Sequence, residues 1–437
     1  MKIIIWKNYK MKKKQILLIG ALSIFALNAN AQVEETLEPV KDTITILQEQ
    51  IDANSSKIKG LEKLKVSGYI QAQAEIGQVG ATAKTGANSG AYSPSIDGKD
   101  AGTFSRFGIR RGRIKFQYSE QKGKAVFQLD ITEKGLGVKN AYFQYDFSNM
   151  FSLLAGINDR PFGDEISYSS NLRESPERSL IFQKLFPDER DLGGQLTINA
   201  PKNTILEGLK LDAGFFSGNG IRVDDNAKLD FIGHLKYDHA TSNMAYGIGA
   251  SMYLGTTNNA DTNLYRVNNG VWSREFVESN QTNVRRYFGF DGQFSIETLM
   301  GITNIRAEYL FGEQPSTSGD FGSPKADTYV ATKAFSYLRK FSGGHVYLVQ
   351  DIYHTPFALV LKYGYLDPNT ELKGNEITNK TDLAMSSFGF GGLWRINSAL
   401  RLQAFYEINT NENTTKISSY SKDVNDNMFT LRLQYKF

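Results

Sequence analysis

The chain has 437 residues, no cysteine and a formal net charge of +4. Without cysteine it has no disulfides, no lipoprotein anchor and no thiolate-bound metal or redox centre. The mean hydropathy of −0.37 excludes a bundle of membrane helices. It is compatible with a membrane β-barrel, whose strands are apolar only at every second residue.

The basic excess lies in the first 31 residues. They hold six lysines and no acid, and removing these six from 50 basic residues leaves 44 against 46 acidic ones, a charge of −2. No general attraction to nucleic acid follows. Lysines at 12–14 precede a short apolar stretch, 16–27, and small residues at 29–31. This order predicts a signal peptide cleaved before Gln32, rather than a retained membrane anchor, for which the stretch is short.

A heptad pattern follows the leader. Two series with a spacing of seven, offset by three residues, form the seam of a coiled coil. The series are Leu37, Ile44, Ile51, Ile58 and Val40, Leu47, Asn54, Leu61. A helix over about 39–62 would be roughly 36 Å long, and its narrow seam favours identical partners. The alternative is a single amphipathic helix that lies on the rim of the next domain or enters it. We assign 32–64 to this helical segment.

From about residue 65 the period changes to two, which indicates β-strands. The alternation of apolar and polar side chains is clear in 66–76, 125–132, 141–147 and 400–408. A soluble sandwich could show the same alternation. Sixteen strands can be placed, near 66–77, 105–119, 124–133, 139–147, 151–159, 191–199, 208–217, 229–238, 244–254, 284–296, 304–312, 343–353, 357–366, 385–395, 399–409 and 427–437.

The connections between these strands alternate in length. The short set is 120–123, 148–150, 200–207, 239–243, 297–303, 354–356 and 396–398. The mostly long set is 78–104, 134–138, 160–190, 218–228, 255–283, 313–342, 367–384 and 410–426. Short turns at one side and long loops at the other are typical of an outer-membrane barrel with periplasmic turns. We therefore predict an all-β fold, a 16-stranded antiparallel transmembrane β-barrel over 65–437, with the helical segment in the periplasm. Segment 313–342 could hide a further pair of strands.

The last strand also points to the outer membrane. Its apolar face is Phe429, Leu431, Leu433, Tyr435 and Phe437, and its polar face is Thr430, Arg432, Gln434 and Lys436. A terminal aromatic strand of this kind resembles the recognition signal of the outer-membrane assembly machinery. Tyr435 and Phe437 would then lie in an aromatic girdle at the membrane boundary. An ordinary C-terminal sheet strand is the alternative.

The densest basic cluster lies in the second predicted strand. It contains Arg106, Arg110, Arg111, Arg113 and Lys115. Because Ile114 and Phe116 would face lipid, the side chains at 111, 113 and 115 would face the lumen. A regular strand would turn Arg110 toward lipid, at a cost of ~2–4 kcal/mol at the midplane. Either Arg106 and Arg110 lie at the outer rim, or a bulge near Gly108 or Gly112 turns Arg110 inward.

Inward arginines would attract anions and offer paired hydrogen bonds to phosphate or carboxylate. The alternative is a basic rim that contacts lipopolysaccharide. The predicted loop 160–190 has the length and mixed charge of a constriction inside a barrel, although an ordinary surface loop fits its composition nearly as well. The candidate pore-lining or anion-binding residues are Arg110, Arg111, Arg113, Lys115, Asp130, Arg160, Arg173, Arg178 and Arg190.

Several stretches of 106–194 match a known pattern. They are Arg110-Arg111-Gly112-Arg113-Ile114, Phe127-Gln128-Leu129-Asp130, Gly156 with Pro161-Phe162, Glu177-Arg178-Ser179, and Arg190 with Gly193 and Gly194. With these, the chain resembles the phosphate-selective porin O/P family, and 367–370 with the closing strand resembles its Bacteroidota branch. The resemblance implies a sixteen-stranded, usually trimeric, diffusion channel. In phosphate-selective members paired arginines line the constriction, a role that would fall on Arg110 and Arg111.

An enzymatic barrel of the phospholipase type would need a serine, a histidine and an orienting amide or acid at the lipid boundary. The four histidines are His234, His239, His345 and His354. None lies in a recognisable Ser/His arrangement, and no zinc-binding spacing or phosphate-binding glycine loop is found. We expect no catalytic residues, no metal and no cofactor.

The sequence thus predicts an outer-membrane porin, a passive diffusion channel for small hydrophilic solutes, with an anion or phosphate preference suggested by its arginines. The expected partners are outer-membrane lipid and lipopolysaccharide, two further copies in a homotrimer, and small anions or other small solutes, with no nucleic acid. The alternative function is a structural or adhesive outer-membrane barrel, filled by its long loops and without significant conductance.

Overall fold

The computed structural model describes residues 46–52, 60, 62–85, 102–222, 224, 226–259, 262–278, 281–323 and 336–437. The chain divides into two units at Leu64. The predicted leader and most of the predicted coiled coil lie outside the described residues. In the first unit, 46–52 are helical, and the seam residues Leu47 and Ile51 are exposed there. No helix of the described residues is long and apolar enough to cross a membrane.

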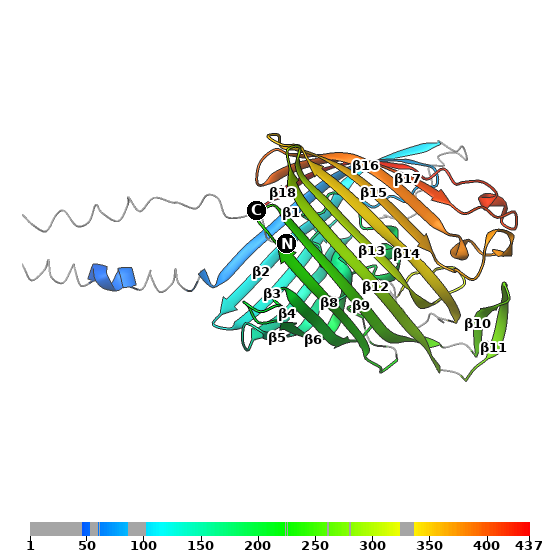
Figure 1. The fold of residues 1–437 in the computed structure, drawn as a ribbon, viewed down its shortest axis with the longest axis horizontal. Helices are drawn as coiled ribbons and strands as arrows, with labels where there is room; N and C mark the ends of the chain where they lie inside the picture. Colours follow the sequence, from blue (N-terminus) through cyan, green and yellow to red (C-terminus); the bar gives the residue numbers. More distant parts are fainter. Residues whose placement is uncertain are drawn as a thin grey trace, which may run out of the picture. The chain divides into compact units, whose positions relative to one another are not determined.

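The second unit is a closed barrel of sixteen antiparallel strands (Figure 1). The barrel strands are β1 (Leu64–Gln78), β2 (Thr103–Glu120), β3 (Gly123–Thr132), β4 (Gly135–Asp146), β5 (Phe151–Asp159), β6 (Arg190–Asn199), β7 (Leu209–Phe216), β8 (Asp230–Ala240), β9 (Met244–Asn259), β12 (Gln281–Thr298), β13 (Gly301–Ser316), β14 (Tyr337–Asp351), β15 (Phe357–Asp367), β16 (Met385–Arg395), β17 (Leu400–Asn411) and β18 (Met428–Lys436). Each overlaps one predicted strand, so the predicted fold is confirmed. The barrel closes where β1 pairs with β18, from Tyr69 opposite Lys436 to Gly77 opposite Met428.

The two ends of the barrel differ in their connections. One end, called the turn end below, has the start of β1, the C-terminus and short connections such as 121–122, 241–243 and 299–300. The other, called the loop end, has most of the long connections. One of these contains a hairpin that the sequence analysis did not predict, β10 (Asn263–Asn268) with β11 (Val271–Phe276). Between β13 and β14, the described residues hold no further strand.

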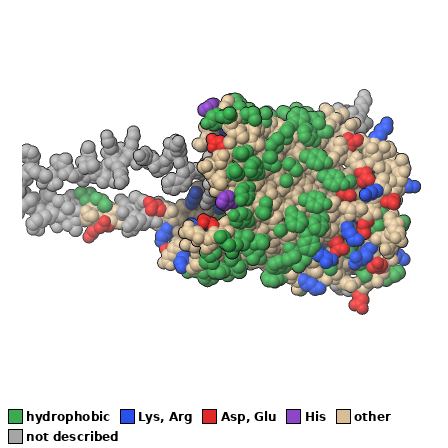
Figure 2. Space-filling view, viewed as in Figure 1, with side chains coloured by type: hydrophobic (Ala, Val, Ile, Leu, Met, Phe, Trp, Pro, Cys, Tyr) green, Lys and Arg blue, Asp and Glu red, His purple; other side chains and the backbone are tan. Residues whose placement is uncertain are grey.

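The outward face of the barrel is apolar, as Figure 2 shows for one side. In β15, Leu359, Leu361 and Tyr363 are exposed, whereas the alternate residues Val360 and Lys362 are buried. Leu431, Leu433, Tyr435 and Phe437 of the closing strand are likewise exposed. A continuous apolar surface of this extent is costly in water and suits contact with lipid.

The connection 160–189, called the inner loop below, packs inside the barrel. It contains α2 (Gly163–Ser167) and α3 (Leu180–Leu185). Its apolar side chains are Phe162, Ile166, Ile181, Phe182, Leu185 and Phe186, and they form one core with inward-facing side chains of the strands, among them Tyr253, Tyr287, Leu310, Phe341 and Leu366. Burial of this apolar core stabilises the inner loop inside the lumen, where its charged residues meet those of the strands.

Candidate functional site

The inner loop enters the lumen at Gly163. This residue has φ +63, and a Cβ there would collide with the Glu308 carboxylate, so only glycine fits without strain. Its amide donates to Ser251 Oγ at 2.8 Å, and the next side chain, Asp164, accepts from Lys236 Nζ at 2.7 Å. These contacts attach the start of the loop to β8, β9 and β13.

The middle of the inner loop is attached to strands at the closure of the barrel. Tyr69 of β1 lies with its hydroxyl 2.5 Å from Ser170 Oγ, and Gln434 of β18 donates to Asn171 O at 3.1 Å. Arg432 of β18 donates to Pro176 O at 2.6 Å. Because β8–β9 and β18–β1 lie well apart in the strand order, the loop crosses the lumen.

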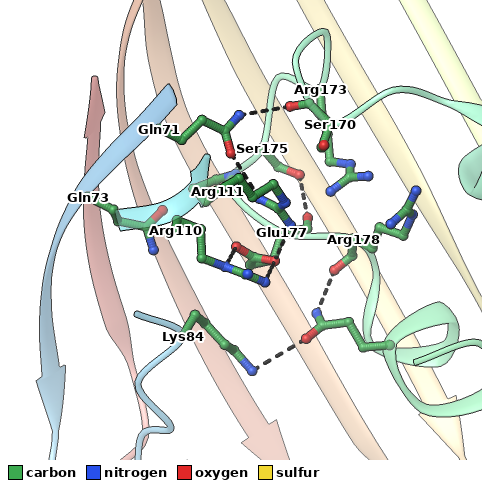
Figure 3. Close-up of polar contacts among 12 residues, drawn as sticks. Gln71, Gln73, Lys84, Arg110, Arg111, Ser170, Arg173, Ser175, Glu177 and Arg178 are labelled. Carbon is green, nitrogen blue, oxygen red and sulfur yellow. Dashed lines mark hydrogen bonds and ion pairs between the residues drawn. The ribbon is translucent and has the colours of Figure 1, made fainter. Parts of the chain in front are cut away.

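Glu177 is the centre of the charged part of the loop (Figure 3). Arg110 donates to both of its oxygens, from Nε at 2.8 Å and from Nη2 at 2.7 Å. Arg111 Nη2 donates to Oε2 at 3.1 Å, and Arg432 Nη2 donates to Oε1 at 2.8 Å. We call these four residues the Glu177 cluster. One carboxylate thus accepts from three guanidinium groups, which leaves the cluster with an excess of positive charge.

Two neighbouring residues of β2 can reach Glu177 because strand alternation is interrupted before Gly112. The β2–β3 pairing runs from Arg113 to Glu120, and two preceding amides donate to side chains instead. Ile109 N donates to Glu133 Oε1 at 2.6 Å, and Gly112 N donates to Asp130 Oδ1 at 3.0 Å. Of the two alternatives for Arg110, the structure therefore has the inward one.

Glutamines of β1 hold the arginines of the cluster. Gln71 Oε1 accepts from Arg111 Nη1 at 3.0 Å, and Gln73 Oε1 accepts from Arg432 Nε at 2.6 Å. Gln71 and Gln73 are almost completely buried. These neutral acceptors orient the guanidinium groups without cancelling their charge.

The inner loop carries four basic and six acidic side chains, but around Glu177 the electrostatics agree with this local excess of positive charge. Burial acts to raise the pKa of Glu177, but Arg110, Arg111 and Arg432 outweigh it and hold that pKa well below its usual range. Arg173 is only 1% exposed, and its Nε and Nη1 have no hydrogen-bond partner among the described residues. Burial, followed by the neighbouring charge of Arg173, lowers the pKa of Arg178.

Most of the remaining candidate residues lie in several separate ion pairs. Arg113 pairs with Asp130 at 3.3 Å and donates to Ser170 Oγ at 3.2 Å. Lys115 lies two residues further along β2, on the same face, and is opposite Gln128 of β3. Arg190 pairs with Asp159 at 3.1 Å. Arg178 pairs with Glu189 within the loop. Arg160 lies apart from the Glu177 cluster, with Asp191 at 2.9 Å, so the nine candidates do not form one site.

Sequence reasoning missed the residues that connect the cluster. The sequence places Glu177 in a matching stretch and among the acids of a mixed loop, and Arg432 on the polar face of the last strand, but it assigns neither to the site. The period-two pattern places Gln71, Gln73 and Arg432 on the non-lipid faces of their strands. That pattern was available, but only the closed barrel shows that β1, β2 and β18 are neighbours.

The wall of the lumen has two kinds of surface. Inward side chains of β14 and β15, such as Tyr347 and Lys362, are at most 2% exposed because the inner loop covers them, and both donate hydrogen bonds to it. We call this side the packed wall. On β2 to β7, where Arg111, Arg113 and Gln195 are buried, several other inward polar side chains are half-buried, and we call this side the open wall. They include Lys115, Gln128, Asp130, Thr197 and Asp212. Solvent therefore adjoins the open wall.

Metal binding and the buried histidines are the two other possible sources of chemistry. Among the described residues, no cluster of three or more His, Asp or Glu side chains could hold a metal ion. His234 Nε2 lies 2.9 Å from Asp291 Oδ2, and His345 Nδ1 lies 3.6 Å from Glu165 Oε2. In both of these pairs the imidazole faces a carboxylate.

Solved structures with a similar fold are outer-membrane channels. The outer membrane channel DcaP of Acinetobacter baumannii has a TM-score of 0.50 and 12% identity, over 86% of this chain and 97% of that one. The anion-selective porin from Comamonas acidovorans has a TM-score of 0.51 and 9% identity, over 86% of this chain and 99% of that one. No protein-family model and no curated protein matches the sequence. The chain therefore has the fold of the outer-membrane porins, and at these identities the likeness concerns the fold alone.

Proposed function

We propose that this protein is a porin of the bacterial outer membrane, which lets small hydrophilic solutes diffuse passively and favours anions. The observation that carries the proposal is the unequal lumen. The packed wall is covered by the inner loop, whereas the open wall presents half-buried polar and charged side chains to solvent. A hydrated strip of this kind inside a closed barrel is suited to the passage of water-soluble molecules.

The anion preference rests on the Glu177 cluster and on Arg173. Three guanidinium groups share one carboxylate, and Arg173 has two buried nitrogens without a partner among the described residues. Fixed positive charge beside a narrow aqueous path attracts anions and repels cations. Phosphate is the finer proposal, since its oxygens match the paired N–H groups of arginine.

The cellular setting follows from the same proposal. A cleaved leader over 1–31 would export the chain, and the turn end would lie in the periplasm with the helical segment 32–64. The exposed apolar belt would contact outer-membrane lipid, and the loop end would contact lipopolysaccharide. We further propose a homotrimer, supported on the periplasmic side by the seam that contains Leu47 and Ile51.

Planar-bilayer recording of the purified protein tests the channel. We expect stepwise conductance. In a gradient of potassium chloride, we expect the reversal potential to lie close to the equilibrium potential of chloride. The double variant Arg111→Ala, Arg113→Ala should lose most of this selectivity. Lys340→Ala is the matched control, because Lys340 is exposed and paired with Glu371 at 2.7 Å. Absence of conductance steps would remove the channel proposal, and unchanged selectivity in the double variant would show that these arginines are not the filter.

Phosphate preference has a separate measurement. Inorganic phosphate added to a chloride solution should reduce the chloride current in a saturable way if it dwells at the arginines. An equal concentration of sulfate controls for divalent charge. Equal block by both anions would leave a general anion preference without selectivity for phosphate.

A second function is favoured by one observation, the apolar core that the inner loop forms with the strands. Since this core fills part of the lumen, the protein could be a structural or adhesive barrel without significant conductance. Bilayer recording distinguishes the two functions directly.

A further inference from the structure

A cavity of about 450 Å³ lies at the loop end of the barrel, outside the Glu177 cluster. It is formed by the β10–β11 hairpin, the first residue of β14 and the connections 368–384 and 412–427. Its volume lies within the range that is usual for small-molecule sites. The cavity has an aromatic part and a polar part, and these two parts carry the inference.

The aromatic part is a platform made by Tyr265, Trp272 and Tyr337. The rings of Tyr265 and Tyr337 are stacked, with centroids 4.5 Å apart and planes 9° apart. Trp272 meets Tyr337 edge to face, with centroids 5.3 Å apart. All three side chains are half-buried and line the cavity, so part of the platform is accessible.

A buried ion pair holds the platform from behind. The Arg339 guanidinium lies 5.1 Å from the ring centroid of Trp272 and 5.3 Å from that of Tyr337. Its Nε donates to Asp382 Oδ1 at 2.7 Å, and both side chains of this pair have no exposed surface. Asp382 belongs to the short helix η2 (Lys380–Asp382). The platform and the polar part of the cavity are therefore joined, and a site with fixed geometry loses less entropy when a ligand binds.

The polar part consists of Arg274, Asn379, Lys380 and Ser419. Asn379 is held in place, since its side chain accepts from Thr381 N at 3.1 Å. Arg274 and Lys380 are exposed, and neither is ion-paired with another described residue. No acidic residue is among the described residues that line the cavity. The cavity thus presents two uncompensated positive charges beside neutral hydrogen-bonding groups.

This combination matches one chemical class of ligand. A sugar ring has a face of C–H groups, whose partial positive charge is attracted to the negative face of an aromatic ring. Its hydroxyl groups point outward from the ring edge and need hydrogen-bond partners, which the polar part supplies. A purely apolar ligand would leave these polar groups unpaired, and a cationic ligand would be repelled by Arg274 and Lys380. The two positive charges favour a sugar that carries a carboxylate or phosphate.

We propose that this cavity binds an acidic saccharide, with a sugar ring against the aromatic platform and its anionic group near Arg274 and Lys380. The site goes beyond the proposed channel function and does not depend on it, because binding can be measured whether or not the barrel conducts. The acidic saccharide could be free in the medium or be part of a lipopolysaccharide core, and the two sources share this chemistry.

Fluorescence titration of the purified protein in detergent tests the proposal. The chain has three tryptophans, Trp6, Trp272 and Trp394, so a Trp6→Phe, Trp394→Phe background reports on Trp272 alone. We expect trigalacturonate, or the de-acylated acidic core oligosaccharide of lipopolysaccharide, to change this fluorescence saturably. Maltotriose, a neutral trisaccharide, should bind at least about tenfold more weakly, the cost of losing a charge-assisted hydrogen bond. The tighter of the two acidic probes identifies the source.

Two variants and a control complete the test. Arg274→Gln and Lys380→Gln should each weaken binding of the acidic probe about tenfold and leave maltotriose binding unchanged. Arg266→Gln is the matched control, because Arg266 lies on the same hairpin, outside the cavity lining, and pairs with Glu275 at 3.6 Å. Calorimetry on Trp272→Ala should show no heat of binding. Absence of saturable binding by both acidic probes, or equal binding of maltotriose, would overturn the proposal.

Discussion

Single residues set the field inside this barrel. At Glu177, one carboxylate accepts from Arg110, Arg111 and Arg432, so an anion that belongs to the chain already occupies the place where three guanidinium groups converge. Although burial opposes ionisation, these arginines hold the pKa of Glu177 well below its usual range. The side chain therefore stays charged at every pH at which the barrel is expected to function.

Glu177→Gln should increase anion selectivity, because the amide keeps the shape of the side chain and removes its negative charge. Because the largely buried arginines would lose their shared carboxylate, the free energy of unfolding should also fall, on the order of 3–5 kcal/mol. Reversal potential and thermal unfolding measure the two effects. Glu371→Gln, at an exposed pair with Lys340, is the control. Selectivity that stays the same in Glu177→Gln would mean that ions do not pass the cluster.

Asp426 gives a pH-dependent prediction outside the strands, in the connection before β18. Burial, and then the nearby charge of Asp423, raises the pKa of Asp426 from 3.8 to about 6. The folded connection therefore keeps a proton that the unfolded one releases, and its stability falls as pH rises from 3.8 to about 6. As pH rises through this range, amide hydrogen exchange in 412–427 should become a few-fold to tenfold faster, after correction for the intrinsic pH dependence of exchange. Asp426→Asn should abolish this pH dependence, and an unchanged profile would contradict the assignment.

At the scale of elements, the inner loop decides how much of the lumen is open. Its position depends on Gly163, whose positive φ and lack of a Cβ allow the chain to pass Glu308. Its apolar residues then join the packed wall, and its polar residues reach the closure of the barrel. Loosening the loop at its entry should therefore change conductance without changing the strands.

Gly163→Ala should destabilise the loop by ~1–3 kcal/mol, because alanine is strained at this φ and its Cβ meets the Glu308 carboxylate. We expect larger and noisier conductance steps in planar bilayers. Gly319→Ala is the control, since a Cβ there has no neighbour within 4 Å and its φ is ordinary. Identical conductance in Gly163→Ala and the native protein would contradict a gating role for the loop entry.

The elements also show what the sequence could and could not predict. All sixteen strands follow from a local property, the alternation of apolar and polar side chains. The β10–β11 hairpin was missed although Asn269 and Gly270, both with positive φ, form the strongest local hairpin signal. The inner loop could not be placed, because its mixed charge fits a surface loop equally well until the inward aromatic residues of β9 to β15 are in place.

For the site, the sequence identified most of the basic residues but not their arrangement. Arg111 and Arg113 were assigned inward by parity. Arg110 required a break in alternation that the sequence left open, and the structure has that break before Gly112. The roles of Glu177 and Arg432 in the cluster depend on contacts between segments that are far apart in the chain. No local sequence pattern contains such contacts.

For the whole molecule, the prediction concerns the proposed homotrimer. Leu47 and Ile51, two residues of the predicted seam, are exposed on the described helix. Deletion of residues 33–62 should weaken a homotrimer if the seam joins subunits, because each helix would lose its buried apolar stripe. Light scattering and chemical cross-linking measure the oligomer. Replacing Asn54 with Ile is an informative companion, since it should strengthen the seam and relax its register. An undiminished trimer after the deletion would favour the rim-helix alternative.

The pairing of β1 with β18 has a consequence for how the molecule is made. Tyr69 and Lys436 are opposite each other although almost the whole barrel sequence lies between them. Contacts of such long separation form late and slowly, since the entropy of closing the intervening chain must first be overcome. Until β18 arrives, β1 and β17 have open edges that invite aggregation. A chain that ends before Met428 would leave the edges of β1 and β17 without their partner strand, so closure of the wall requires that the whole sequence be present.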